Sequence, residues 1–93
     1  MSTIARQVLY EGRVQGVGFR YSVKQVATGY EVTGSVRNLA DGRVELLVSG
    51  EPGEVEAFLR EIAESHLAAH IGRSEEHDLP GDLPDARGFQ ILS

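Results

Sequence analysis

Alternating hydrophobic positions near the start of the chain predict a first β-strand. Over residues 6–14, one face carries four residues in alternation: Val8, Tyr10, Gly12 and Val14. The residues between them are mostly polar, and a period of two residues is typical of a strand with one buried side. The glycine-rich segment 15–18 interrupts this alternation, so we expect the strand to end there.

Two later stretches have helical periodicity. From about Tyr21, apolar residues recur at intervals of three and four, namely Val23, Val26, Ala27 and Tyr30. This spacing predicts one apolar helix face, and the helix is expected to end around residues 32–34. The second stretch starts near Pro52, which is tolerated in a first helical turn, and its apolar positions are Val55, Phe58, Leu59, Ile62 and Ala63. We expect this helix to run to about Ser65 or His66.

A pair of strands is expected between the two helices. Segments 35–39 and 43–49 flank Asp41-Gly42, a dipeptide typical of hairpin turns, and residues 44, 46 and 48 alternate as apolar positions. In the last part of the chain, residues 70–77 predict a short strand. Residues 77–88 are rich in proline, glycine and aspartate and predict a loop, and residues 88–92 predict a final strand.

The order of these elements predicts the fold class. It is β-α-β-β-α-β plus a short C-terminal strand, which indicates an α+β, ferredoxin-like two-layer sandwich. In that arrangement two helices lie on one face of an antiparallel sheet. The chain of 93 residues is expected to form a single domain over 1–93. This fold has many unrelated functions, so it does not by itself identify an activity.

Composition narrows the function classes. Hydrophobic residues make up 41% and charged residues 25%, which is typical of a globular protein. The sequence contains no cysteine, which excludes disulfides, thiolate zinc sites and a cysteine nucleophile, and it fits a cytoplasmic protein. No apolar run is long enough for a membrane span, and the N-terminus lacks the apolar region of a secretory signal.

The charges are distributed unevenly. The net charge is −5, which argues against non-specific binding of nucleic acid. Residues 1–43 nevertheless carry six basic and three acidic side chains, whereas residues 44–93 carry three basic and eleven acidic ones. An anion site is therefore expected in the first half of the chain.

The segment GRVQGVGFR, residues 12–20, is the main candidate for such a site. It lies between a predicted strand and a predicted helix, where glycines permit backbone turns whose amides bind anions. The helix N-terminus adds further amides, and Arg20 can hold a phosphate through two hydrogen bonds. On composition alone, an ordinary glycine loop beside a surface arginine remains an equal alternative.

Two segments together resemble the acylphosphatase family: GRVQGVGFRYSVKQVA (12–27) and TGSVRNLADGRVE (33–45). The resemblance implies the ferredoxin-like fold and hydrolysis of acyl phosphates to a carboxylate and inorganic phosphate. It implies that Arg20 binds the phosphate and that Asn38 positions the attacking water. It also implies that the phosphate is cradled by the backbone amides of Gln15, Gly16, Val17, Gly18, Phe19 and Arg20.

The resemblance carries further expectations about partners and chemistry. We expect a monomer whose substrate is a small acyl phosphate and for which inorganic phosphate is product and inhibitor. No metal, cofactor, nucleic acid or membrane is expected to take part. One departure from the family is Ser35, which stands where an aromatic residue is usual and is expected to alter the packing beneath Asn38.

Two other functions and one other site stay open from the sequence. One function is a carbamoyl-phosphate-processing module, like the acylphosphatase domain fused to hydrogenase-maturation proteins. The other is a ferredoxin-like regulatory domain that senses an anion without turnover. His66, His70 and His77 could suggest a metal site, but solvated histidines near a helix end explain them better.

Overall fold

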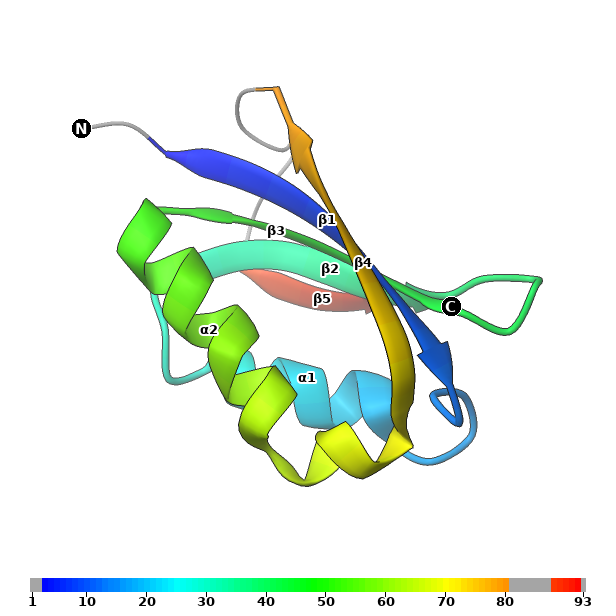
Figure 1. Ribbon diagram of the computed structural model, residues 1–93. Coiled ribbons are helices and arrows are strands. Elements are labelled where there is room, and N and C mark those ends of the chain that lie inside the picture. The colour runs from blue at the N-terminus through cyan, green and yellow to red at the C-terminus, as the bar shows by residue number, and fades with distance from the viewer. Residues whose placement is uncertain (1–2, 81–87, 93) are drawn as a thin grey trace.

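The computed structural model describes residues 3–80 and 88–92. Its strands are β1 (Ile4–Gly12), β2 (Val32–Asn38), β3 (Val44–Gly50), β4 (Ile71–Leu79) and β5 (Phe89–Leu92). Its helices are α1 (Phe19–Ala27), α2 (Pro52–Glu64) and the short 3-10 helix η1 (His66–His70). Both long helices cover the same face of the sheet, so the predicted two-layer α+β sandwich is confirmed (Figure 1).

The sheet has five strands in the order β4-β1-β3-β2-β5. The first four strands in that order pair antiparallel, but β5 pairs parallel with β2, aligning Val36 with Ile91. The expectation of a purely antiparallel sheet is therefore wrong, and the sheet is mixed. The reason is topological: β5 follows β4 but joins the opposite edge of the sheet, beside a strand that runs in its own direction.

The predicted strand near residues 70–77 is confirmed and is longer than expected. β4 runs to Leu79, so the first residues of the predicted 77–88 loop belong to a strand; residues 81–87 of that loop lie outside the described residues. The extension pairs with β1 as far as Ala5 and Leu79, and Arg6 of β1 contacts Asp78 at 3.1 Å and Glu76 at 3.5 Å across the two strands. The side chains of β4 are almost all exposed, as suits a polar edge strand.

One apolar core fills the space between the sheet and the helices. The strands contribute buried side chains at alternate positions, and the helices contribute buried side chains at helical spacing. The main members are Val8, Tyr10, Val36, Val44, Leu46, Val48, Phe19, Val23, Val55, Phe58 and Ile62. The rings of Tyr10 and Phe19 lie 5.3 Å apart, so the core fixes the start of α1 against β1.

Asn38 is carried by a strand that has no room for a side chain at one position against its neighbour. Gly34 of β2 has a φ of 157°, and a Cβ atom at this position would lie 1.9 Å from the carbonyl oxygen of Leu47 in β3. No side chain larger than hydrogen fits there without moving one of the two strands. Gly34 therefore permits the backbone conformation with which β2 pairs with β3, four residues before Asn38.

Candidate active site

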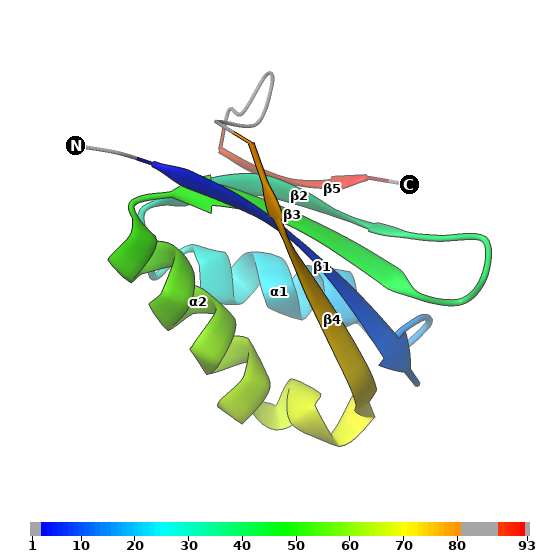
Figure 2. The same ribbon diagram turned by 45° about the horizontal axis from the view of Figure 1, so that its top comes forward.

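The loop between β1 and α1 lies at the same end of the sandwich as two other segments. This glycine loop, residues 13–18, is near the turn between β2 and β3 and near the C-terminal end of β5 (Figures 1 and 2). Segments far apart in the sequence thus meet at one end of the molecule. The predicted site residues all come from this end.

The glycine loop has the backbone geometry expected of an anion site. Gly16 and Gly18 adopt φ values of 78° and 75°, in the left-handed region that favours glycine. The amide of Arg13 donates to His70 at 2.9 Å, and the amide of Ser22 donates to Gly18 at 3.0 Å. Between them, no backbone amide donates a hydrogen bond to any of the described residues. A run of consecutive donors is therefore available to a ligand.

A pocket of about 170 Å³ opens beside these amides. Its lining residues come from the loop, from the start of α1, and from the ends of β2 and β5; they are Val14, Gly16, Gly18, Phe19, Arg20, Tyr21, Asn38 and Ile91. The structure therefore brings Arg20 and Asn38 to one pocket, although they lie on different elements. Of the predicted amide donors, Gly16, Gly18 and Phe19 line the pocket with Arg20, whereas Gln15 and Val17 do not.

Arg20 is held by the last strand of the chain. It is the second residue of α1, and its Nη1 donates a hydrogen bond of 2.7 Å to the backbone carbonyl of Leu92. This contact uses one guanidinium nitrogen, and Nε and Nη2 have no partner among residues 3–80 and 88–92, so both can bond a ligand. The role of Leu92 was missed from the sequence, because any residue offers the same carbonyl and nothing marks this one.

Asn38 carries an unsatisfied polar atom at the pocket. It is the last residue of β2 and lies on the same face as buried Val36, two residues earlier. Its Oδ1 is buried and has no hydrogen-bond partner among the described residues. Burying an acceptor without a partner costs free energy. The arrangement is therefore suited to a ligand or water that donates to this oxygen.

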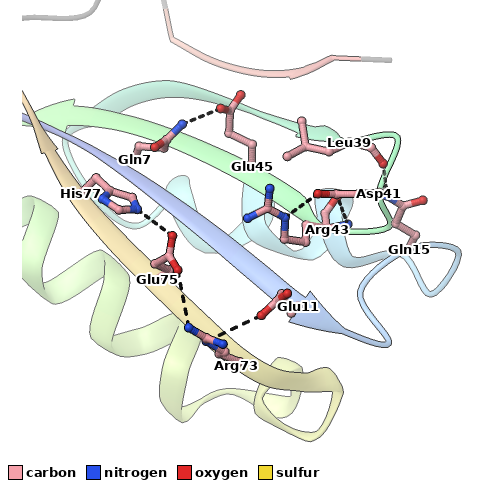
Figure 3. A network of polar contacts seen from close by, with 10 residues as sticks. All are labelled: Gln7, Glu11, Gln15, Leu39, Asp41, Arg43, Glu45, Arg73, Glu75 and His77. Atoms are coloured by element: carbon pink, nitrogen blue, oxygen red, sulfur yellow. Dashed lines mark hydrogen bonds and ion pairs between the residues drawn. The ribbon is translucent and has the colours of Figure 1, made fainter.

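The side chain of Gln15 connects the glycine loop to the β2–β3 turn. Its Nε2 donates to the carbonyls of Leu39 at 2.8 Å and of Arg43 at 3.0 Å (Figure 3). The turn itself is closed by Asp41, whose carboxylate accepts from the amide of Arg43 at 3.1 Å and from its Nε at 2.8 Å. These hydrogen bonds, the amide bond first, lower the pKa of Asp41 below its ordinary value. Sequence reasoning assigned Gln15 only a backbone role and missed this link.

Ser35 does not lie beneath Asn38. Residues 33, 35 and 37 of β2 alternate with the buried positions and lie on the open face of the sheet, away from the helices. Arg37 pairs there with Glu45 at 2.7 Å. The expectation that Ser35 alters the packing under Asn38 is therefore wrong, because the two side chains are on opposite faces of the same strand.

The three histidines do not form a metal site. His66 and His70 belong to η1, and His77 lies on β4, where its Nε2 contacts Glu75 at 2.8 Å (Figure 3). This contact lowers the pKa of the Glu75 carboxyl. Within residues 3–80 and 88–92, no group of three or more histidine, aspartate or glutamate side chains could hold a metal ion. Nor is any helix in those ranges long and apolar enough to cross a membrane.

Comparisons with known proteins agree with the motifs. The family model for acylphosphatase matches residues 6–91. The chain belongs to the acylphosphatase family. An acylphosphatase of Lacticaseibacillus paracasei is 37% identical over 92 residues, covering 98% of each chain. Acylphosphatases of this kind are hydrolases that act on acyl phosphates, so the predicted family and enzyme class are confirmed.

Solved structures with the same fold support this assignment. The crystal structure of the acylphosphatase from Bacillus subtilis has a TM-score of 0.85 and 29% identity, covering 97% of this chain and 99% of that chain. A full-length HypF in a phosphate- and nucleotide-bound form has a TM-score of 0.84 and 30% identity over 99% of this chain, but only 12% of its own length. The acylphosphatase fold therefore also occurs as a small part of a longer protein.

Proposed function

We propose that this acylphosphatase binds the phosphoryl group of its substrate in the glycine loop and that Asn38 orients the attacking water. One observation carries the proposal: free loop amides, Arg20 and the unpartnered Oδ1 of Asn38 all border one pocket. The first two are donors suited to an anion, and the third is an acceptor suited to water. The pocket thus offers donors to bind the phosphoryl group and an acceptor to orient the attacking water.

Phosphoryl binding follows from charge and donor geometry. Consecutive amides and the N-terminus of α1 stabilise negative charge without any reorganisation during the reaction. Arg20 adds a full positive charge, and its planar guanidinium can bond two phosphoryl oxygens at once. Its bond to the Leu92 carbonyl restricts the guanidinium before substrate arrives, which lowers the entropy cost of binding.

The hydrolysis step is a displacement at phosphorus. Water donates a hydrogen bond to Oδ1 of Asn38, which turns a lone pair of the water oxygen toward phosphorus. The water oxygen bonds to phosphorus as the bond between phosphorus and the bridging oxygen breaks, and the carboxylate leaves with that electron pair. The leaving group is a weak base and needs no proton from the protein.

The proton of the attacking water needs an acceptor. No histidine, aspartate or glutamate borders the pocket among the described residues. A phosphoryl oxygen of the substrate therefore takes this proton, and the products are a carboxylate and inorganic phosphate. Positioning and electrostatic stabilisation then supply the rate acceleration.

The proposal extends to partners and location. Inorganic phosphate carries the same oxygens as the reacting group, so it should bind the same donors and inhibit the enzyme as well as being its product. A small diffusible substrate is compatible with a monomer. The complete lack of cysteine is compatible with the cytoplasmic location that we propose.

The test is a steady-state assay with acetyl phosphate, with added inorganic phosphate as competitor. We expect hydrolysis without added metal, and competitive inhibition by phosphate. Phosphate binding without turnover of acetyl phosphate or carbamoyl phosphate would favour an anion-sensing domain instead. Turnover of carbamoyl phosphate far above that of acetyl phosphate would favour the carbamoyl-processing alternative.

A further inference from the structure

Large hydrophobic side chains are exposed at the end of the sandwich that holds the pocket. Four such side chains stand out in the described part of the chain: Val17 (44% exposed), Tyr21 (62%), Ile91 (38%) and Leu92 (38%). They come from the glycine loop, the start of α1 and the end of β5, three segments that meet at one end of the sandwich (Figures 1 and 2). The other large hydrophobic side chains in the described part of the chain are less exposed.

Two of these side chains border the pocket in which the reaction is proposed to occur. Tyr21 follows Arg20 on α1, and Tyr21 and Ile91 both border the pocket. Ile91 aligns with buried Val36 and so lies on the helix-covered side of the sheet. Leu92 is the next residue along the strand, so its side chain points to the open face and only its backbone reaches Arg20.

We infer that Tyr21 and Ile91 form a subsite for the acyl group, and that the enzyme prefers acyl phosphates with apolar chains or rings over acetyl phosphate. The inference rests on the proposed function, in which the phosphoryl group is bound by the loop amides and Arg20. The acyl carbon is joined to that phosphoryl group through one bridging oxygen. The rest of the acyl group must therefore lie at the mouth of the same pocket, beside these two side chains.

The chemistry of the lining favours an apolar occupant. Arg20 is the one charged residue that borders the pocket among the described residues, and the phosphoryl group requires its charge. An apolar acyl chain would cover exposed carbon on Tyr21 and Ile91 and displace water from it, which favours binding. A charged acyl group would lose its own hydration against the same side chains without gaining a charged partner, since Arg20 is engaged by the phosphoryl group.

The size of the preference follows from the exposure of the subsite. Complete burial of one methylene improves binding about fourfold. The mouth is open to solvent, so we expect about twofold per methylene, or about 16-fold in kcat/KM for hexanoyl phosphate, which has four more methylenes than acetyl phosphate. Straight-chain carboxylic acids have nearly equal acidity, so the reactivity of the anhydride hardly changes along this series. The ratio of kcat/KM for hexanoyl phosphate to kcat/KM for acetyl phosphate therefore measures contact of the acyl chain with the subsite.

The test compares kcat/KM for acetyl, butyryl and hexanoyl phosphate in the wild type and four variants. Tyr21→Ala and Ile91→Ala should each lower the hexanoyl-to-acetyl ratio at least threefold. Tyr21→Phe should keep the wild-type ratio, because the ring is retained and only the hydroxyl is lost. Leu47→Ala is the control: this apolar side chain lies on the open face of β3, away from the pocket, and its removal should leave the ratio unchanged.

The outcomes separate this inference from the proposed function. A wild-type enzyme that hydrolyses all three substrates with equal kcat/KM would overturn the acyl subsite and leave the proposed function standing. Failure to hydrolyse any of them would overturn the proposed function itself. A fall of the ratio in Leu47→Ala as large as in Tyr21→Ala would also refute the subsite. Circular dichroism of each variant verifies folding, and Tyr21 is exposed enough to be replaced without loss of the core.

Discussion

The link made by Gln15 leads to a prediction that separates catalysis from stability. Its Nε2 bonds two carbonyls of the β2–β3 turn, so Gln15→Ala removes both hydrogen bonds and frees the glycine loop from the strand that carries Asn38. Each such bond contributes about 0.5–1.5 kcal/mol, and this side chain is exposed, so we expect a loss of about 1–2 kcal/mol. For a domain of this size that corresponds to a fall in Tm of about 4–12 °C.

The catalytic effect of Gln15→Ala should exceed this loss of stability. A displacement of about 1 Å between Arg20 and Asn38 can lower a rate by about 10². We therefore expect kcat for acetyl phosphate to fall at least tenfold at 25 °C, where the variant remains folded. Phosphate inhibition should weaken less, because the loop amides and Arg20 are still present.

A second variant and a control sharpen this test. Gln15→Glu has the same shape but places a carboxylate against two carbonyl oxygens, so it should be at least as damaging as the alanine. Gln25→Ala removes an exposed glutamine from α1 and should change neither Tm nor kcat. A Gln15→Ala enzyme with lower Tm but wild-type kcat would refute the positioning role and leave only a structural one.

Three further changes test separate parts of the structure. Arg20→Lys should lower kcat/KM by about 10²–10³ with an unchanged circular dichroism spectrum, because an ammonium cannot replace the bidentate guanidinium; wild-type turnover would contradict this. Gly34→Ala should lower the free energy of unfolding by about 3 kcal/mol in urea, because its Cβ would overlap the carbonyl of Leu47; a loss below about 1 kcal/mol would disprove the close approach. The pKa of Asp41 is lowered, so its stabilisation of the turn is complete above the ordinary pKa and is lost as pH falls through the lowered one. An NMR titration of Asp41 should therefore have its midpoint below that of an unfolded peptide, and an equal midpoint would contradict the bond to Arg43.

The features that could be predicted from the sequence are those with local signals. Apolar periodicity changes from two to about 3.6 residues on passing from β1 to α1, and this is visible within a few residues of the boundary. The Asp41-Gly42 dipeptide indicates the hairpin in the same local way. Arg20 lies near the start of α1 and Asn38 at the end of β2. The predicted elements together with the family resemblance therefore assign both residues to one predicted site.

The features that could not be predicted depend on distant or backbone contacts. β4 has polar side chains on both faces, so no alternation marks its full length; its extension is made by pairing with β1, a strand distant in the sequence. The direction of β5 depends on which edge of the sheet it reaches. The carbonyls that bind Gln15 and Arg20 belong to Leu39, Arg43 and Leu92, and backbone carbonyls are the same in every residue.

Asn38→Ala tests the division of roles that the proposed function requires. Arg20 and the loop amides are proposed to hold the phosphoryl group, whereas Asn38 is proposed to act on the water. Removing a group that acts mainly in the transition state lowers kcat with little change in ground-state binding. The variant also removes a buried oxygen that has no partner among the described residues, so stability should be equal or slightly higher.

The decisive measurement is kcat for acetyl phosphate and the inhibition constant of inorganic phosphate, determined on the same preparation of Asn38→Ala. The proposed roles predict a fall in kcat of about 10² or more, equivalent to about 3 kcal/mol, with the phosphate inhibition constant within about twofold of the wild type. A parallel loss of phosphate affinity would make Asn38 a binding residue. An unchanged kcat would contradict its role in orienting the water.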